Sequence, residues 1–185
     1  LSKIRDIRAS EKRVYQKVRD LFSLCSDYDK TDKATQMFFA ETQNKLLYAL
    51  TQRTAAEIIG ERADASKPNM GLTSWQGSVV RKGDVIIAKN YLLADEIDTL
   101  NRLVTIFLEA AELSVKERKD LTLDFWRKNV DRLLDYQDKP LLQGKGSITS
   151  KYSEERAKEI YDEFNTFRKH QEAIAADMDD LKFLN

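Results

Sequence analysis

Apolar residues recur at helical spacing along most of the chain. Over residues 1–25 and 32–50, and from about Asp95 to Lys119, they stand three, four and seven positions apart, which is the spacing of one face of a helix. A shorter pattern ends before Pro140, and a last one begins near Ser153 and continues almost to the end. The sequence therefore predicts an all-α fold of about six helices, with long first and last helices.

The last pattern predicts one continuous buried face along the final helix. Its inward positions are Ala157, Ile160, Tyr161, Phe164, Phe167, Ile174, Met178 and Leu181.

The stretch from Arg53 to Tyr91 interrupts these regular patterns. Thr54 and Glu57 have the spacing of a capping box, in which each side chain reaches a backbone amide, and this predicts a short helix to about Ala63. A long loop follows, because a proline at 68 and glycines at 71, 77 and 83 break regular structure. Two structures fit the next residues equally well: 78–80 and 85–88 pair as a small β-hairpin, or 85–88 form the first turn of the next helix. Long irregular segments on a helical scaffold often carry function.

Length and composition favour a single helical domain spanning residues 1–185. The chain has 31 basic and 31 acidic residues, so its net charge gives no reason to expect the whole domain to attract nucleic acid. Basic residues nevertheless gather between positions 1 and 19, and acidic ones from Glu172 onward. These are two solvated helix faces, or else the basic helix meets DNA or the acidic end of another copy. The second interpretation favours antiparallel or swapped pairing of two chains.

Cys25 is the only cysteine, and its place on an apolar stripe predicts a small buried side chain. A lone cysteine fits a reducing compartment, so we expect a cytoplasmic protein. We expect no membrane span, because no run of about eighteen apolar residues occurs. No motif predicts a cofactor or a metal site.

The opening residue is Leu1, and it enters a helical pattern without a cap. We therefore expect further sequence upstream.

Three segments resemble a known family. They read IRDIRASEKRVYQKVRDLF, ALTQRTAAEIIGERADASKPNMGLTSWQG and DVIIAKNYLLADEIDTLNRLVTIFLEAAEL, and they are similar to the carboxy-terminal half of the RhuM-type virulence proteins. The resemblance extends to about Tyr136. It implies that an amino-terminal half, similar to phage-regulator DNA-binding domains, precedes this segment. It supplies no biochemical activity.

Two functions are carried forward from the sequence. The first is a helical oligomerisation or partner-binding domain, pairing with a second copy or another protein, in a DNA-binding regulator of bacterial virulence. The alternative is a metal-dependent nuclease or nucleotide-directed toxin, with Glu61, Asp64 and Glu112 holding a divalent cation and Lys67 or Lys89 contacting phosphate. No catalytic residue is assigned. The candidate functional surface comprises Arg53, Glu61, Arg62, Asp64, Lys67, Asn69, Trp75, Lys89, Asn90, Tyr91 and Glu112.

Overall fold

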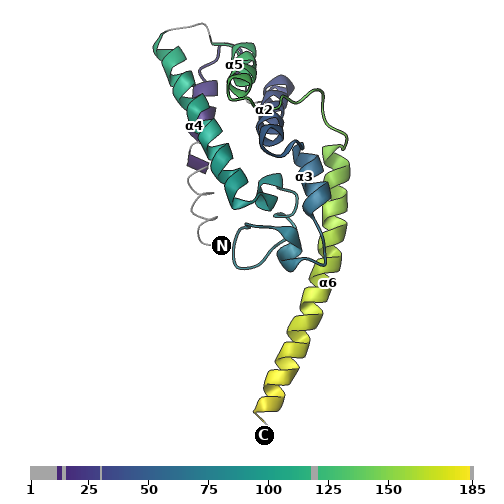
Figure 1. Ribbon diagram of the computed structural model, residues 1–185. Helices are drawn as coiled ribbons and strands as arrows, with labels where there is room; N and C mark the ends of the chain where they lie inside the picture. The colour runs from purple at the N-terminus through teal and green to yellow at the C-terminus, as the bar shows by residue number, and fades with distance from the viewer. Residues whose placement is uncertain (1–11, 14–15, 30, 118–120, 184–185) are drawn as a thin grey trace.

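The computed structural model shows an all-α protein, as the sequence predicts (Figure 1). The structure describes residues 12–13, 16–29, 31–117 and 121–183, and every regular element within these ranges is helical. Residues 16–22 are helical, but much of the predicted long first helix, including Lys3, Arg5 and Arg8, lies outside the described ranges. The remaining elements are α2 (Lys33–Thr51), α3 (Ala55–Arg62), the 3-10 turns η1 (Pro68–Gly71) and η2 (Ala88–Tyr91), α4 (Ala94–Lys116), α5 (Leu123–Tyr136) and α6 (Ser150–Lys182).

An aromatic cluster joins the helical residues 16–22 to α2, α4 and α5. The ring of Phe22 lies 5.0 Å from Phe38, 5.7 Å from Phe107 and 5.9 Å from Trp126, measured between centroids. The first two contacts are edge-to-face and the third is tilted, and such ring contacts add to the free energy of burying the rings. The indole Nε1 of Trp126 donates a 3.0 Å hydrogen bond to the Cys25 sulfur. Cys25 is thus buried as predicted, and burial raises the pKa of its thiol to about 11.

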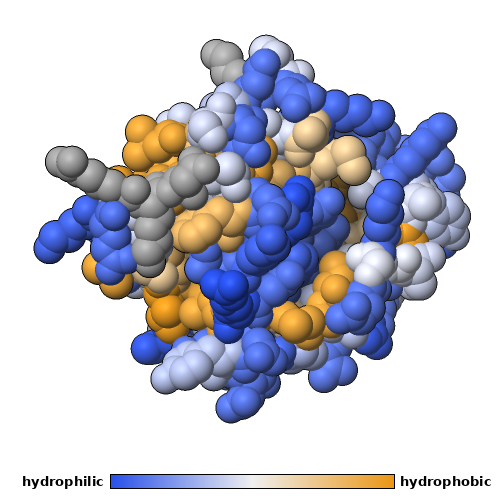
Figure 2. Space-filling model, turned by 90° about the horizontal axis from the view of Figure 1, so that it is seen from above, coloured by the Kyte–Doolittle hydropathy of each residue, from blue (hydrophilic) through white to orange (hydrophobic). Residues whose placement is uncertain are grey.

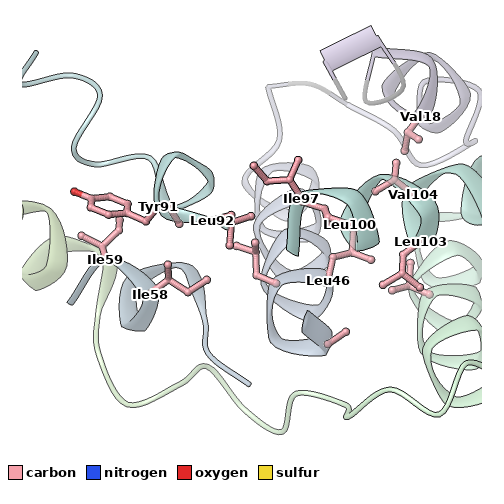
Figure 3. Close-up of a cluster of buried hydrophobic side chains, with 14 of the residues drawn as sticks. Val18, Leu46, Ile58, Ile59, Tyr91, Leu92, Ile97, Leu100, Leu103 and Val104 are labelled. Carbon is pink, nitrogen blue, oxygen red and sulfur yellow. The ribbon is translucent and has the colours of Figure 1, made fainter. Parts of the chain in front are cut away.

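A second part of the core surrounds α3. This helix packs against η2 on one side and α6 on another, and its Ile58 and Ile59 lie near Tyr91 and Leu92 in the same buried cluster (Figure 3). The cluster continues along α4 and also contains Met70, Val80 and Val85. The segment that interrupts the helical pattern is therefore part of the core. Fixing α6 against α3, the Ser153 hydroxyl donates to the Ala56 carbonyl oxygen at 3.1 Å.

Side-chain caps begin several helices where the sequence predicts them. Asp32 accepts from the Ala34 amide at the start of α2. Thr54 accepts from the Glu57 amide and Glu57 accepts from the Thr54 amide, so the predicted capping box is confirmed. Such caps satisfy amides that have no partner within the helix. The last helix starts slightly earlier than predicted, because Thr149 provides its cap.

The predicted β-hairpin is wrong: residues 78–80 and 85–88 form no strands. Asp84 is buried instead, and its carboxylate accepts hydrogen bonds from the backbone amides of Gln76 and Arg81 at 3.1 and 2.8 Å. The Asn90 side chain in turn donates to the Asp84 carbonyl oxygen at 3.0 Å. Short polar side chains that bind nearby backbone compete with strand pairing, and here they fold the loop into turns. The alternative, that residues 85–88 form the first turn of the next helix, is closer to the structure, because residues 82–86 form a turn that leads into η2.

The final helix leaves the body of the molecule halfway along its length (Figure 1). Ala157 and Phe164 are buried, as predicted, and so is Ser153. The prediction is wrong further on, because Phe167, Ile174, Met178 and Leu181 are 61%, 41%, 60% and 60% exposed. The apolar pattern continues where the body has ended, so periodicity alone could not distinguish a buried face from a solvent-facing one. None of the described helices is long and apolar enough to cross a membrane.

Candidate functional site

Arg62 connects the end of α3 to the start of α4. Its two terminal nitrogens each lie 2.7 Å from an oxygen of Glu96, and one of them also donates to the Tyr91 carbonyl oxygen at 3.0 Å. Glu96 also accepts from the Leu93 amide. Burial alone would raise the pKa of Glu96, but the Arg62 hydrogen bonds, the Leu93 amide and the charge of Arg62 together outweigh it, and the pKa is lowered. Both partners of this ion pair are therefore occupied in holding the fold.

Asn90 and Tyr91 are buried residues beside this ion pair, since Arg62 donates to the Tyr91 carbonyl oxygen. The Asn90 carbonyl oxygen accepts from the amides of Thr73 and Ser74 at 2.7 and 3.2 Å. The Tyr91 hydroxyl donates to the Val85 carbonyl oxygen at 2.7 Å, and burial raises the pKa of this phenol. The Asn90 backbone and the Tyr91 hydroxyl thus hold the loop over residues 72–90, and both residues are shielded from solvent.

Residues 69–71 adopt a left-handed turn. Asn69 and Met70 have φ of 53° and 59°, and Gly71 follows at 85°. A left-handed conformation costs about 1–2 kcal/mol for a residue with a Cβ, so the surrounding contacts must hold the turn. Met70 is fully buried, and its carbonyl oxygen accepts from the Asp64 amide. The turn therefore inserts Met70 into the core and leaves Asn69 at the surface.

Arg53 and Glu61 form an ion pair beside a polar surface hollow. The Arg53 Nε lies 2.6 Å from a Glu61 oxygen, with both side chains about half exposed. The hollow has a volume of about 600 Å³. Its lining residues are Tyr48, Gln52, Arg53, Glu57, Gly60, Glu61, Leu142, Gln143, Gly146, Ser147 and Ile148. The charges of Arg53 and Glu61 neutralise each other there, and the remaining lining carboxylate, Glu57, is bound to backbone amides.

Glu57 joins two segments of the chain at this hollow. One of its oxygens caps α3, and the other accepts from both the amide and the hydroxyl of Ser147 at 2.7 Å. The hydrogen bonds from the Ser147 and Thr54 amides lower the pKa of Glu57 to about 2. A single carboxylate thus fastens the start of α3 to the segment that leads into α6.

We predict that Glu57 makes the stability of the protein depend on pH. A lowered pKa in the folded state means that the carboxylate stabilises the fold above its ordinary pKa of 4.5, and that this contribution is lost as the pH falls towards about 2. In thermal unfolding at pH 7, Glu57→Gln should melt below wild type, and the difference should shrink on acidification. Glu172→Gln, on the exposed half of α6, is the matched control. A difference that stays constant with pH would contradict the assignment.

The remaining candidate residues are dispersed. Asp64 accepts from the amide and hydroxyl of Ser66, which lower its pKa. Lys67 is exposed, whereas Trp75 and Lys89 are half-buried. Glu112 lies on the exposed face of α4, near its C-terminal end.

This placement does not bring together the carboxylates of the alternative hypothesis. Glu61 binds Arg53, Asp64 binds its own loop and Glu112 lies on another helix. Among the described residues, no group of three or more His, Cys, Asp or Glu side chains could hold a metal ion. The divalent cation proposed for Glu61, Asp64 and Glu112 therefore has no support in the geometry.

The exposed half of α6 carries apolar side chains that the sequence pattern assigns to the buried face of the helix, although one interpretation of its acidic residues is a contact with another copy. We call Phe167, Ile174, Met178 and Leu181 the α6 stripe. These side chains recur at seven, four and three residues, so they lie in one line along the helix. The opposite end of the molecule also shows apolar side chains, but there hydrophilic residues separate them into patches (Figure 2). The signal that could have located the stripe is the continuation of an apolar pattern past the last residues that α6 buries.

Comparison with known families agrees with the resemblance noted in the sequence. Residues 1–173 match the model of the Virulence protein RhuM family, and the chain belongs to this family. The match continues past Tyr136, where the resemblance was expected to end, and includes most of α6. No curated protein and no solved structure matches the chain.

Proposed function

We propose that this RhuM-family domain is an oligomerisation domain in which α6 pairs with α6 of a second copy. The observation that carries the proposal is the α6 stripe, four large apolar side chains that are 41–61% exposed on one face of a projecting helix. Single exposed apolar residues are common on protein surfaces, whereas an aligned group marks a contact surface. A second copy supplies an identical stripe, so the two faces are complementary in character.

The conformation of α6 gives a second reason. From residue 169 to 183, all described side chains are exposed, so this half of the helix receives no support from the body. Helices of this length are marginal in water unless an apolar face packs against something. Pairing of two stripes would bury the apolar side chains and stabilise both helices together.

The proposal gives the family domain a place in a larger regulator. A domain that pairs two chains would bring together two copies of any DNA-binding domain linked to it, as two adjacent half-sites in DNA require. We place this function in the cytoplasm, where Cys25 stays reduced. The candidate residues Arg62, Asn90 and Tyr91 then serve to hold the body that carries α6.

Charge placed on the α6 stripe is expected to abolish association. We predict that wild type sediments as a dimer in analytical ultracentrifugation, and that Ile174→Glu combined with Met178→Glu sediments as a monomer, because paired stripes would bury four carboxylates. Both side chains are exposed in the single chain, so the body should keep its thermal transition. Ala176→Glu, on the other side of the same helix, should remain dimeric. A strictly monomeric wild type at high concentration would refute the proposal.

A further inference from the structure

We infer that the two α6 helices pair in parallel and in register, as a short left-handed coiled coil in which Gln171 sets the register. This inference rests on the proposed function and specifies how the second copy is bound. It follows from the heptad pattern of the stripe, the charges beside it and the face of α6 that the body leaves open.

The α6 stripe follows a heptad repeat with one polar position. Phe167, Ile174 and Leu181 are seven residues apart and occupy the d positions, and Met178 occupies an a position. The other a position between Phe167 and Leu181 is Gln171, which is exposed. Side chains at a and d that recur in this way line the contact of a two-stranded coiled coil.

Only the parallel arrangement covers the whole stripe. In a parallel, in-register pair, each a or d residue meets its own counterpart. Each of the four apolar side chains therefore packs against the same side chain of the second copy. Antiparallel helices pair a with d. One such register sets Met178 opposite Phe167 but leaves Leu181 facing Phe164 of the second copy, which is already buried in its own body. The next register sets Gln171 opposite Leu181 and moves Phe167 beyond the stripe.

The charge beside the stripe also favours parallel helices. Asp177 occupies a g position and Lys182 the following e position, five residues later. In a parallel coiled coil, g of one helix lies next to the following e of the other, so Asp177 would meet Lys182 of the second copy on both sides of the pair. In the single chain Lys182 binds Asp179 of its own helix, and both side chains are largely exposed. In an antiparallel pair g positions face each other, and Asp177 loses this partner.

The body of the molecule leaves room for a parallel partner. Eighteen residues make about five helical turns, so Arg156 points to the same side of α6 as Ile174. Arg156 is exposed, as are Glu159 and Glu163 on neighbouring turns of that side. A straight helix rotates its heptad positions by about 20° per heptad, which turns the stripe away from the face that carries Ala157 and Phe164. A second helix can therefore run beside α6 without displacing the body.

Gln171 is the residue that would select this arrangement. A single polar residue at an a position stabilises a coiled coil less than an apolar one, but it favours the register in which it meets its own counterpart. The two amide side chains can then donate to and accept from each other. In either antiparallel register Gln171 faces an apolar d residue, and its amide would have no partner in the contact.

Disulfide cross-linking of full chains tests the orientation. Cys25 is 6% exposed and its pKa is raised, so an introduced cysteine should be the reactive one. We expect Leu181→Cys to form a disulfide with itself under mild oxidation, because only a parallel, in-register pair brings two copies of residue 181 together. An antiparallel pair would leave Leu181→Cys uncrosslinked and instead join chains in a mixture of Phe167→Cys with Met178→Cys, or of Gln171→Cys with Leu181→Cys. That result would overturn this inference and leave the proposed function standing.

The role of Gln171 has a separate test. Gln171→Leu should lower the dissociation constant of the dimer several-fold in sedimentation, since an apolar layer replaces a polar one. In the same variant, Leu181→Cys should self-crosslink less completely, because the register is no longer selected. Unchanged cross-linking would show that Gln171 does not set the register. A sample that remains monomeric and forms no cross-link in any combination would instead remove the proposed function itself.

Discussion

Replacing Gly71 with alanine is expected to destabilise the fold by about 3 kcal/mol or more. Losses of stability of this size arise when a substitution strains the backbone or disrupts the core. At Gly71, φ is 85°, and an added Cβ would overlap the carbonyl oxygen of Arg62. Because that oxygen belongs to the backbone at the end of α3, rotation of a side chain cannot relieve the overlap. The midpoint of thermal unfolding should fall by about 6–12 °C, given about 2–4 °C for each kcal/mol in a domain of this size.

Gly77→Ala is the matched control for this prediction. Gly77 has nearly the same φ, 80°, but nothing lies within 4 Å of an added Cβ. The stability lost by Gly77→Ala should be limited to the cost of the left-handed conformation, about 1 kcal/mol. The difference between the two variants then measures the close approach of residue 71 to α3. Equal losses would show that the approach to Arg62 contributes nothing.

Arg62→Ala is expected to cost about 2 kcal/mol, the range for a hydrogen-bonded charged group that loses its partner. The side chains of Arg62 and Glu96 are only 26% and 19% exposed, so water replaces the lost contacts incompletely. The variant also leaves the Tyr91 carbonyl oxygen without its donor. Chemical denaturation monitored by circular dichroism should show the midpoint moving to lower denaturant with little change in slope.

Arg53→Ala provides the comparison for Arg62→Ala. Its ion pair with Glu61 has a similar distance, 2.6 Å, but the two side chains are 44% and 50% exposed. Exposed ion pairs contribute little, because water and salt screen them. We expect an unfolding midpoint close to wild type. If Arg53→Ala proved as damaging as Arg62→Ala, the link between α3 and α4 would not be the source of the effect.

The helices could be predicted from the sequence because local signals specify them. Asp32 and the pair Thr54 and Glu57 begin helices where the pattern places them, and Cys25 lies in the core as its place on an apolar stripe indicates. These features depend on residues within a few positions of one another. The bonding of Glu57 to Ser147 could not be predicted in the same way, since it joins residues 90 positions apart.

The central segment could be recognised as irregular, but its internal structure could not be derived. The apolar residues at 85–87 favour a strand, yet Asp84 and Asn90 bind the backbone and remove that option. The candidate residues share polar or aromatic chemistry, and all but Glu112 lie between Arg53 and Tyr91. The fold pairs Arg62 with Glu96 on α4, which was not among the candidates, and leaves Glu112 on a later turn of the same helix, so the chemistry of the residues alone did not predict their partners.

The length of α6 has a mechanical consequence. Its N-terminal half is fixed to α3 by Ser153, and Glu57 holds the segment just before it, while the other half projects freely. At 1.5 Å per residue, the free half is a lever arm of about 25 Å. A tilt of about 10° at the fixed half would move the tip by about 4 Å, roughly three-quarters of the rise of one helical turn. Small adjustments where α3 meets α6 are therefore amplified into displacements at the far end of the rod.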